Sequence, residues 1–217
     1  MVRIPTPVIH ALQFYGVVAV DPESPLPLGP GLSLVTYRDI AAITSDAPYS
    51  RVAVDDARVA SHRRVVESVF EHRAILPAPV GTVFRSRDAL MRWLELHYFT
   101  FTEAMQTVDG TVMGRVTARF DNGLPIDQAL PERPPTVIAA EEEVAASFQA
   151  LRRRASACIS LPVNEPRTRR MSYLVPRDRW KVFREGVRDE QQRVGGATLS
   201  VSGPWPPYDF IRMQFGS

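Results

Sequence analysis

Besides the carboxylates, five side chains could serve as metal ligands or as nucleophile and base: His10, His62, His72, His97 and Cys158. Zinc sites need His, Cys or carboxylate ligands at short, characteristic spacings, and no pair among these five has such a spacing. A single cysteine also excludes an intrachain disulfide and a multi-cysteine metal site. No Ser or Cys stands near a His in a familiar catalytic pattern. These residues therefore predict neither a metal centre nor a nucleophilic active site.

The clustered carboxylates are explained by helix ends. Asp55 and Asp56 precede an apolar helical pattern, where an aspartate caps free backbone N–H groups. The run 141–143 is acidic and 152–154 is basic within a later helical pattern, which matches the helix dipole in sign. Gly29-Pro30-Gly31 is interrupted by proline and precedes no helix, so it predicts no phosphate loop. We therefore expect a protein without enzymatic activity or cofactor.

Composition and charge describe an ordinary folded chain, with 45% hydrophobic and 23% charged residues and a formal net charge of +2. The densest basic clusters, at 152–154 and 167–170, are short and are balanced by acidic residues elsewhere. They predict solvated surface rather than a nucleic-acid interface. No apolar run approaches the roughly 20 residues of a membrane span. The N-terminal residues lack an apolar signal core, so we expect a cytoplasmic location.

The first half predicts a strand-rich α+β domain, residues 1–108. Residues 11–20 predict a strand that is apolar on both faces, as in the centre of a covered sheet. Shorter strands are expected at 32–35, 39–44 and 80–84. Helical spacing of apolar residues predicts one helix over 55–73 and a second that begins near Ser86 and includes Met105. His62 lies on the apolar face of the first helix, which favours a core or boundary histidine over a ligand.

The second half predicts a ferredoxin-like domain, residues 109–217. Asp109-Gly110 marks a turn and the expected domain boundary. Residues 111–120 alternate cleanly between two faces, as in a strand. A helix over 137–155, a hairpin of 158–163 and 170–175, a helix over 177–194 and a strand over 197–202 follow. This βαββαβ order is the ferredoxin-like pattern, in which two helices cover one face of an antiparallel sheet.

The same topology raises an RNA-binding alternative, because RNA-recognition modules share it. Those modules stack bases on aromatic side chains of the two central strands. Here the two strands would carry only Phe120 and Tyr173 as aromatics, without the glycine-rich aromatic signature. Fold analogy alone does not establish this function.

The segment 202–210 contains three prolines in four positions, which excludes a helix and an inner strand. A stiff, extended segment of this kind holds Trp205 and Tyr208 at set positions. Two interpretations are open: a lid over the chain's own core, or an exposed anchor for a partner, since preorganised aromatics bury large areas at little entropic cost.

The string Gly203-Pro204-Trp205-Pro206-Pro207-Tyr208 resembles the C-terminal hallmark of the gas vesicle protein F/L family. Other motifs of the family appear in its order along nearly the whole chain. They are Phe14-Tyr15-Gly16-Val17-Val18, the strand 39–45, His62 with Val65, Val66 and Glu67, Pro77 followed by Gly81-Thr82-Val83-Phe84, and Ser172-Tyr173-Leu174-Val175. Asp209 departs from the family, which usually has Ser at this position.

This resemblance implies a two-domain α+β accessory protein of gas vesicle formation. Its expected partners are the small hydrophobic major gas vesicle shell protein and other gas vesicle accessory proteins, in the cytoplasm and at the gas vesicle. We expect Trp205 and Tyr208 to anchor a partner, with Arg115 and Arg119 as polar support. Two alternatives are an adaptor of the same fold in an organism without gas vesicles, and a small-ligand enzyme with a site between the domains that uses His62 or His97.

Overall fold

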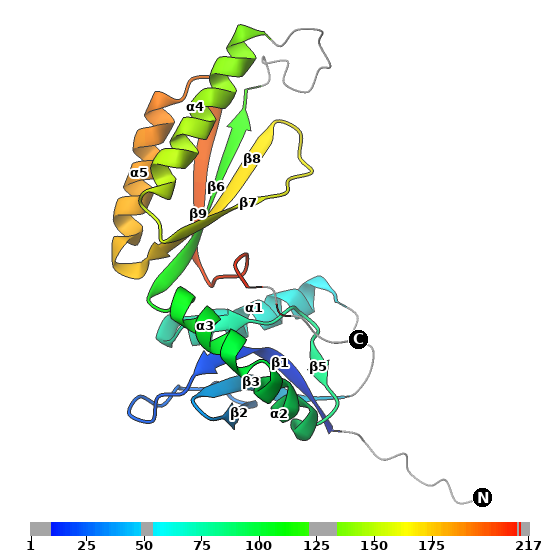
Figure 1. The fold of residues 1–217 in the computed structure, drawn as a ribbon. Coiled ribbons are helices and arrows are strands. Elements are labelled where there is room, and N and C mark those ends of the chain that lie inside the picture. The colour runs from blue at the N-terminus through cyan, green and yellow to red at the C-terminus, as the bar shows by residue number, and fades with distance from the viewer. Residues whose placement is uncertain (1–9, 49–53, 122–133, 212, 214–217) are drawn as a thin grey trace, which may run out of the picture. The chain divides into compact units, whose positions relative to one another are not determined.

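A computed structural model describes residues 10–48, 54–121, 134–211 and 213 (Figure 1). The chain divides into two units: unit 1 comprises Met1–Asp109 and Pro206–Ser217, and unit 2 comprises Gly110–Trp205. The division after Asp109 lies at the predicted turn. The residues beyond Trp205 belong to unit 1, however, whereas the sequence places the whole tail in the second domain.

Unit 1 is built on an antiparallel sheet in the order β2-β3-β1-β4, with β5 also paired to β1. The strands are β1 (His10–Ala19), β2 (Leu32–Tyr37), β3 (Ile40–Pro48), β4 (Ile75–Pro77) and β5 (Val83–Phe84). The inner position of β1 confirms the prediction from its two apolar faces. Its buried side chains include Phe14, Val17 and Val18. The short strand β4 was not predicted.

Three helices accompany this sheet: α1 (Asp56–His72), α2 (Arg87–Leu96) and α3 (Tyr98–Val108). The single helix predicted from Ser86 onward is therefore wrong, because the backbone at His97 leaves helical geometry (φ −102°, ψ 10°). The break brings the first residue of α3, Tyr98, against the turn between β2 and β3, where its hydroxyl donates to Asp39 Oδ1 at 2.6 Å.

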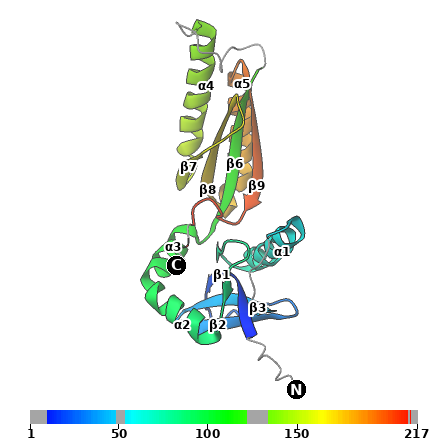
Figure 2. The same ribbon diagram turned by 90° about the vertical axis from the view of Figure 1, so that its right-hand side faces the viewer.

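Unit 2 has the predicted ferredoxin-like fold. Its strand order is β7-β8-β6-β9, and α4 and α5 lie on one face of the sheet (Figures 1 and 2). The elements in chain order are β6 (Thr111–Phe120), α4 (Pro135–Arg152), β7 (Ala157–Leu161), β8 (Thr168–Pro176), the 3-10 turn η1 (Arg177–Arg179), α5 (Trp180–Arg193) and β9 (Ala197–Trp205).

The core of unit 2 lies between the sheet and these helices. Tyr173 of β8 is fully buried, donates its hydroxyl to Phe148 O of α4 at 3.2 Å and contacts the ring of Phe183 of α5. Gly114 of β6 faces Trp180, and a Cβ at this glycine would lie 2.6 Å from the indole ring. The absent side chain therefore allows α5 to approach the sheet closely.

Strand β9 continues to Trp205 and includes Pro204, beyond the predicted end at residue 202. Proline is tolerated because β9 is an edge strand, where one side of the backbone needs no ladder donor. The register with β6 shifts between Met113 and Arg115, so Gly203 and Pro204 form a bulge before Trp205 pairs with Met113.

Candidate partner-binding surfaces

Metal ligands do not gather in the described part of the chain: no group of three His, Cys, Asp or Glu side chains lies close enough together there to hold an ion. None of the helices in these ranges is long and apolar enough to cross a bilayer. The residues that the sequence assigns to partner binding, by contrast, have defined places in the fold.

The face of the unit 2 sheet opposite α4 and α5 is named here the open face (Figure 2). Alternation along β6 places Arg115, Thr117 and Arg119 on it, because the intervening Val116 and Ala118 are buried toward the helices. Cross-strand pairing then identifies the remaining members of the open face. They include Met113, Ile159, Leu161, Thr168, Arg170, Ser172, Leu174, Thr198, Ser200 and Ser202, of which Met113, Thr168, Ser172 and Leu174 are buried.

Two arginines of the open face converge on one carboxylate. Arg119 Nη2 lies 3.7 Å from Glu165 Oε2, and Arg170 Nη2 lies 3.5 Å from Glu165 Oε1. Glu165 comes from the loop between β7 and β8 and is about half exposed, at 54%. Arg170 is further held by a hydrogen bond from its Nε to Thr117 Oγ1 at 3.2 Å.

Trp205 lies toward the other end of the same sheet, since Arg119 pairs with Thr198 of β9, seven residues before Trp205. It pairs with Met113 of β6, and its Nε1 donates to Ser202 Oγ at 3.5 Å, so its indole faces the side that carries Ser202. The side chain is half-buried. The structure thus brings three of the four predicted binding residues, Arg115, Arg119 and Trp205, to one face of one unit.

The aromatics considered for RNA stacking lie on the opposite face. Phe120 and Tyr173 are only 4% and 0% exposed and pack toward the helices. Burial raises the pKa of Tyr173, which keeps its hydroxyl neutral as a donor. Neither ring can stack on a base, so the fold analogy with RNA-recognition modules gains no support from these residues.

Tyr208, the fourth predicted residue, belongs to unit 1 and is half-buried. The preceding Pro206 and Pro207 are buried, and Tyr208 N donates to Pro206 O at 2.7 Å. The Tyr208 side chain lines a pocket of about 430 Å³ together with His62 and Ala78. Within its unit, this part of the tail packs as the lid interpretation predicts.

His62 is 2% exposed, and its Nε2 lies 3.0 Å from Ala78 O. The carbonyl requires Nε2 to carry the proton, which leaves Nδ1 as an unprotonated nitrogen without a hydrogen-bond partner among the described residues. Burial lowers the pKa of His62, although the bond to Ala78 acts in the opposite direction. The ring also packs against Tyr15, with centroids 5.2 Å apart. This confirms the predicted core histidine.

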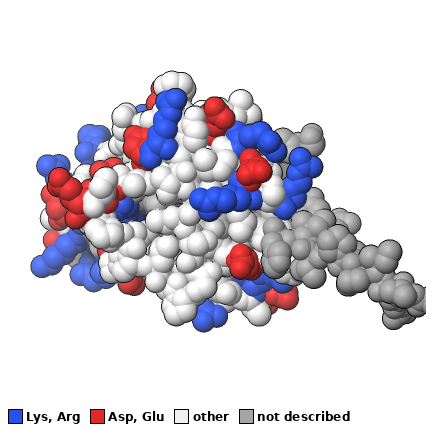
Figure 3. All heavy atoms as spheres, turned by 90° about the horizontal axis from the view of Figure 1, so that it is seen from below, with Lys and Arg blue, Asp and Glu red and all other residues white. Residues whose placement is uncertain are grey.

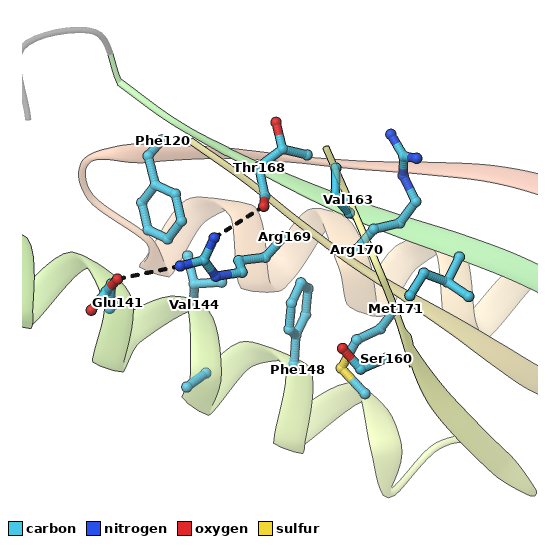
Figure 4. A pocket seen from close by; sticks show the side chains of 12 residues that line it. Phe120, Glu141, Val144, Phe148, Ser160, Val163, Thr168, Arg169, Arg170 and Met171 are labelled. Carbon is cyan, nitrogen blue, oxygen red and sulfur yellow. Dashed lines mark hydrogen bonds and ion pairs between the residues drawn. The ribbon is translucent and has the colours of Figure 1, made fainter. Parts of the chain in front are cut away.

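A groove of about 450 Å³ runs between α4 and strands β7 and β8 in unit 2 (Figure 4). Phe148 of α4 and Phe120 of β6 form part of its apolar wall. At one end Arg169 Nη2 lies 3.6 Å from Glu141 Oε1, and the guanidinium stands 5.9 Å from the Phe120 ring centre. The charged side chains at this end are therefore paired within the unit.

The most exposed large apolar side chains in the described ranges are Leu96 and Phe99, each 78% exposed. They flank His97 and Tyr98 at the junction of α2 and α3. Sequence reasoning missed both, because they lie off the apolar stripe of the predicted helix. That position was itself a signal, since a bulky apolar residue on the polar side of an amphipathic helix has no core to enter.

Neighbouring residues hold this junction in place. The Tyr98 ring contacts Phe99 and Tyr37, and the guanidinium of Arg38 lies 4.9 Å from the Tyr98 ring centre. The hydrogen bond to Asp39 raises the pKa of Tyr98. We name Leu96 and Phe99 the apolar pair. Tyr98, which lies between them in the chain, is held by Arg38 and Asp39.

Figure 3 looks at the chain from below the view of Figure 1, where α2 and β2 lie. Residues other than Lys, Arg, Asp and Glu form much of the middle of this face, into which a basic side chain also reaches, and most other charged residues lie toward its margin.

Comparison with known proteins agrees with the resemblance in sequence. The sequence model of the family described as gas vesicle synthesis protein GvpL/GvpF matches residues 12–155 and 138–212. Gas vesicle protein F2 of Halobacterium salinarum is 27% identical over 191 residues, which cover 84% of this chain and 81% of that protein. Gas vesicle protein F of Haloferax mediterranei is 25% identical over 191 residues, covering 84% of this chain and 83% of that protein.

The fold is also similar to solved structures. The crystal structure of GvpF from Anabaena sp. PCC7120 superposes with a TM-score of 0.78 at 15% identity, covering 95% of this chain and 100% of that one. GvpF from Microcystis aeruginosa gives a TM-score of 0.74, also at 15% identity, covering 94% and 99% of the two chains. The sequence match extends over most of the chain, and the chain belongs to the gas vesicle synthesis protein GvpL/GvpF family.

Proposed function

We propose that this chain is a non-enzymatic accessory protein of gas vesicle assembly that binds the hydrophobic major shell protein and other accessory proteins, in the cytoplasm and at the vesicle. Membership of the family supports a role connected with gas vesicles. A shell subunit with a large apolar face would aggregate before assembly unless another protein shields or orders it. An accessory protein that does so needs an apolar surface fixed on a stable scaffold.

The apolar pair is the observation that carries this proposal. Leu96 and Phe99 each expose 78% of their surface. Covering such a side chain with a partner contributes about 2 kcal/mol. The aromatic contacts of Tyr98 order the junction beforehand, so little conformational entropy is lost on binding.

Trp205 and Tyr208 stay in the proposal as anchors, with Arg115 and Arg119 as polar support. Both aromatic side chains are already half-buried within the chain, so each offers a partner less apolar surface than Leu96 or Phe99. We therefore expect their contribution to shell binding to be the smaller one.

The enzyme alternative has less support. It would need His62 or His97 as a reactive group. His62 directs Nε2 at a backbone carbonyl, and His97 packs between Trp93 and Phe101, with ring centres 5.2 Å and 5.8 Å away. Both histidines have structural roles, which favours a binding protein. An adaptor for other partners is the remaining alternative, and shell binding separates the two.

The test is capture of the purified major shell protein on the immobilised chain. The variant Leu96→Ser/Phe99→Ser should bind the shell protein at least about tenfold more weakly than wild type. Each lost apolar contact is worth about 2 kcal/mol, and about 1.4 kcal/mol corresponds to a factor of ten in affinity. Val182→Ser is the matched control, since Val182 is 57% exposed on α5 of unit 2. Trp205→Ala and Tyr208→Ala should reduce capture less.

Circular dichroism would establish that each variant is folded. Undiminished capture by folded Leu96→Ser/Phe99→Ser would remove the apolar pair from the proposal. No capture by wild type would remove shell binding itself and leave the adaptor alternative.

A further inference from the structure

We propose that the open face of unit 2 binds a carboxylate-rich segment of another protein, and that Glu165 occupies the place of the partner's carboxylate until that segment arrives. This surface lies in a different unit from the apolar pair. The inference does not depend on shell binding, and each can fail without the other.

Charge is the first observation. Strands β6, β7, β8 and β9 contain no Asp or Glu at any position. Arg119 and Arg170 nevertheless point to the same face of this sheet. The carboxylate that reaches both of them, Glu165, comes from a loop. A surface with this excess of arginine is complementary to an acidic partner.

The geometry at Glu165 is the second observation. Each of its two carboxylate oxygens is approached by one guanidinium, at 3.5 Å and 3.7 Å. Both distances are longer than the roughly 2.8 Å of a strong charged hydrogen bond. Arg119 and Glu165 are 69% and 54% exposed, so the pair is weak and open to exchange. Arg170 stays on the face when Glu165 leaves, because Thr117 holds its Nε.

The surroundings favour a protein segment over a nucleic acid. Besides the arginines, the accessible part of the open face carries hydroxyl side chains on β6 and β9, and Ile159 and Leu161 on the edge strand β7. The β8 hydroxyls of Thr168 and Ser172 are buried. Apolar side chains beside arginines fit a peptide that carries apolar as well as acidic residues. Phe120 and Tyr173, which would have to stack bases, are buried on the other face.

The arginines also set the form of the segment. Arg119 and Arg170 come from the neighbouring strands β6 and β8 and reach the two oxygens of one carboxylate. In an extended peptide, alternate side chains point to the same side. A segment with Glu at every second position therefore presents a row of carboxylates to this pair of arginines.

The probe is a fluorescein-labelled peptide, Glu-Leu-Glu-Ala-Glu-Leu-Glu, titrated with the full-length protein at low salt and followed by fluorescence anisotropy. The same peptide with Gln in place of each Glu is the probe control. Wild type should bind the acidic peptide more tightly than the control peptide. Added salt should weaken this binding, because exposed charge pairs are screened.

The variants make the test specific. Arg119→Gln/Arg170→Gln should weaken binding at least about fivefold, whereas Glu165→Gln should tighten it about two- to fivefold, since it frees both arginines. Arg184→Gln is the matched control, because Arg184 is exposed on α5, which covers the other face of the sheet.

Three results would overturn the proposal that the open face binds an acidic segment. Absent or salt-independent binding by wild type and by Glu165→Gln would overturn the inference. Weaker binding by folded Glu165→Gln would also overturn it, since Glu165 would then support the site rather than occupy it. Tighter binding of a single-stranded uridine oligonucleotide of equal charge than of the peptide would reassign the face to nucleic acid.

Discussion

His62 is a buried histidine that the fold holds in its neutral form. Its Nε2 donates to Ala78 O, and burial lowers its pKa below the usual value of about 6.5. The unfolded chain therefore binds a proton at a pH where the folded chain does not. The contribution of His62 to stability is complete above about pH 6.5 and is lost as the pH falls toward the lower pKa of the folded state.

We predict that the free energy of unfolding of wild type falls between pH 7.5 and 5.5 by more than that of His62→Gln, which keeps a donor but does not titrate. For each pH unit between the pKa of His62 in the unfolded chain and its lower pKa in the folded chain, the free energy of unfolding changes by at most about 1.4 kcal/mol. Urea denaturation at several pH values measures this. His72→Gln is the control, because His72 is exposed. An equal pH dependence of the free energy of unfolding in wild type and His62→Gln would contradict the conclusion that the fold holds His62 in its neutral form.

Gly114 makes a second prediction at the residue scale. A Cβ would lie 2.6 Å from Trp180, whose ring is stacked on Phe183 at 5.9 Å and has little room to move. We expect Gly114→Ala to destabilise the protein by about 1–3 kcal/mol through overpacking. Gly195→Ala is the matched control, since its nearest atom, Glu143 Oε2, is 3.7 Å away. A neutral result for Gly114→Ala in urea denaturation would mean that α5 shifts freely on the sheet.

Sequence reasoning at the residue scale worked where a regular pattern decides the answer. Alternation along β6 placed Arg115 and Arg119 on one face, and helical spacing placed His62 in the core. It failed for Leu96 and Phe99, because an exposed apolar side chain breaks the pattern that identifies a helix face. Which loop residue meets Arg119 depends on tertiary contact, so Glu165 could not be found either.

At the scale of elements, α1 begins after an N-cap residue for which the sequence offered two candidates, Asp55 and Asp56. Asp55 is the residue that caps, since its Oδ1 accepts from Arg58 N at 2.8 Å. We predict that Asp55→Ala costs about 1 kcal/mol of stability, whereas Asp55→Asn, which can accept the same bond, costs little. The urea concentrations at the midpoints of unfolding compare the stabilities of the two variants with that of wild type. An equal loss in both variants would assign the effect to charge at the helix terminus instead.

The order of elements in unit 2 was predictable because each has a clear period: two for the strands and near 3.6 for the helices. The break between α2 and α3 was not. No Gly or Pro marks it, and the apolar stripe continues through His97, whose ring packs with Trp93 and Phe101. Tyr98 contacts Asp39, which lies 59 residues earlier in the sequence, and no local sequence pattern reveals a contact over that separation.

At the scale of the whole molecule, the chain carries two separate candidate surfaces on its two units. The apolar pair belongs to unit 1 and the open face to unit 2. One chain could thus hold two partners at once, which raises the effective concentration of each for the other.

The path of the tail also belongs to this scale. The sequence predicted an extended proline-rich segment after the last strand, but not that residues beyond Trp205 belong to unit 1. Proline content restricts local conformation and removes backbone donors. It carries no information about which unit the chain joins next, so the domain limits at the C-terminus could not be derived from it.

The most direct test of the account is light scattering of the major gas vesicle shell protein on dilution from denaturant. An equimolar amount of wild-type chain should suppress the scattering, and Val182→Ser should do the same. Leu96→Ser/Phe99→Ser should not suppress it, because the surface that covers the shell subunit is gone. Full suppression by the folded double variant, or none by wild type, would contradict the claim that this chain shields the shell protein through the apolar pair.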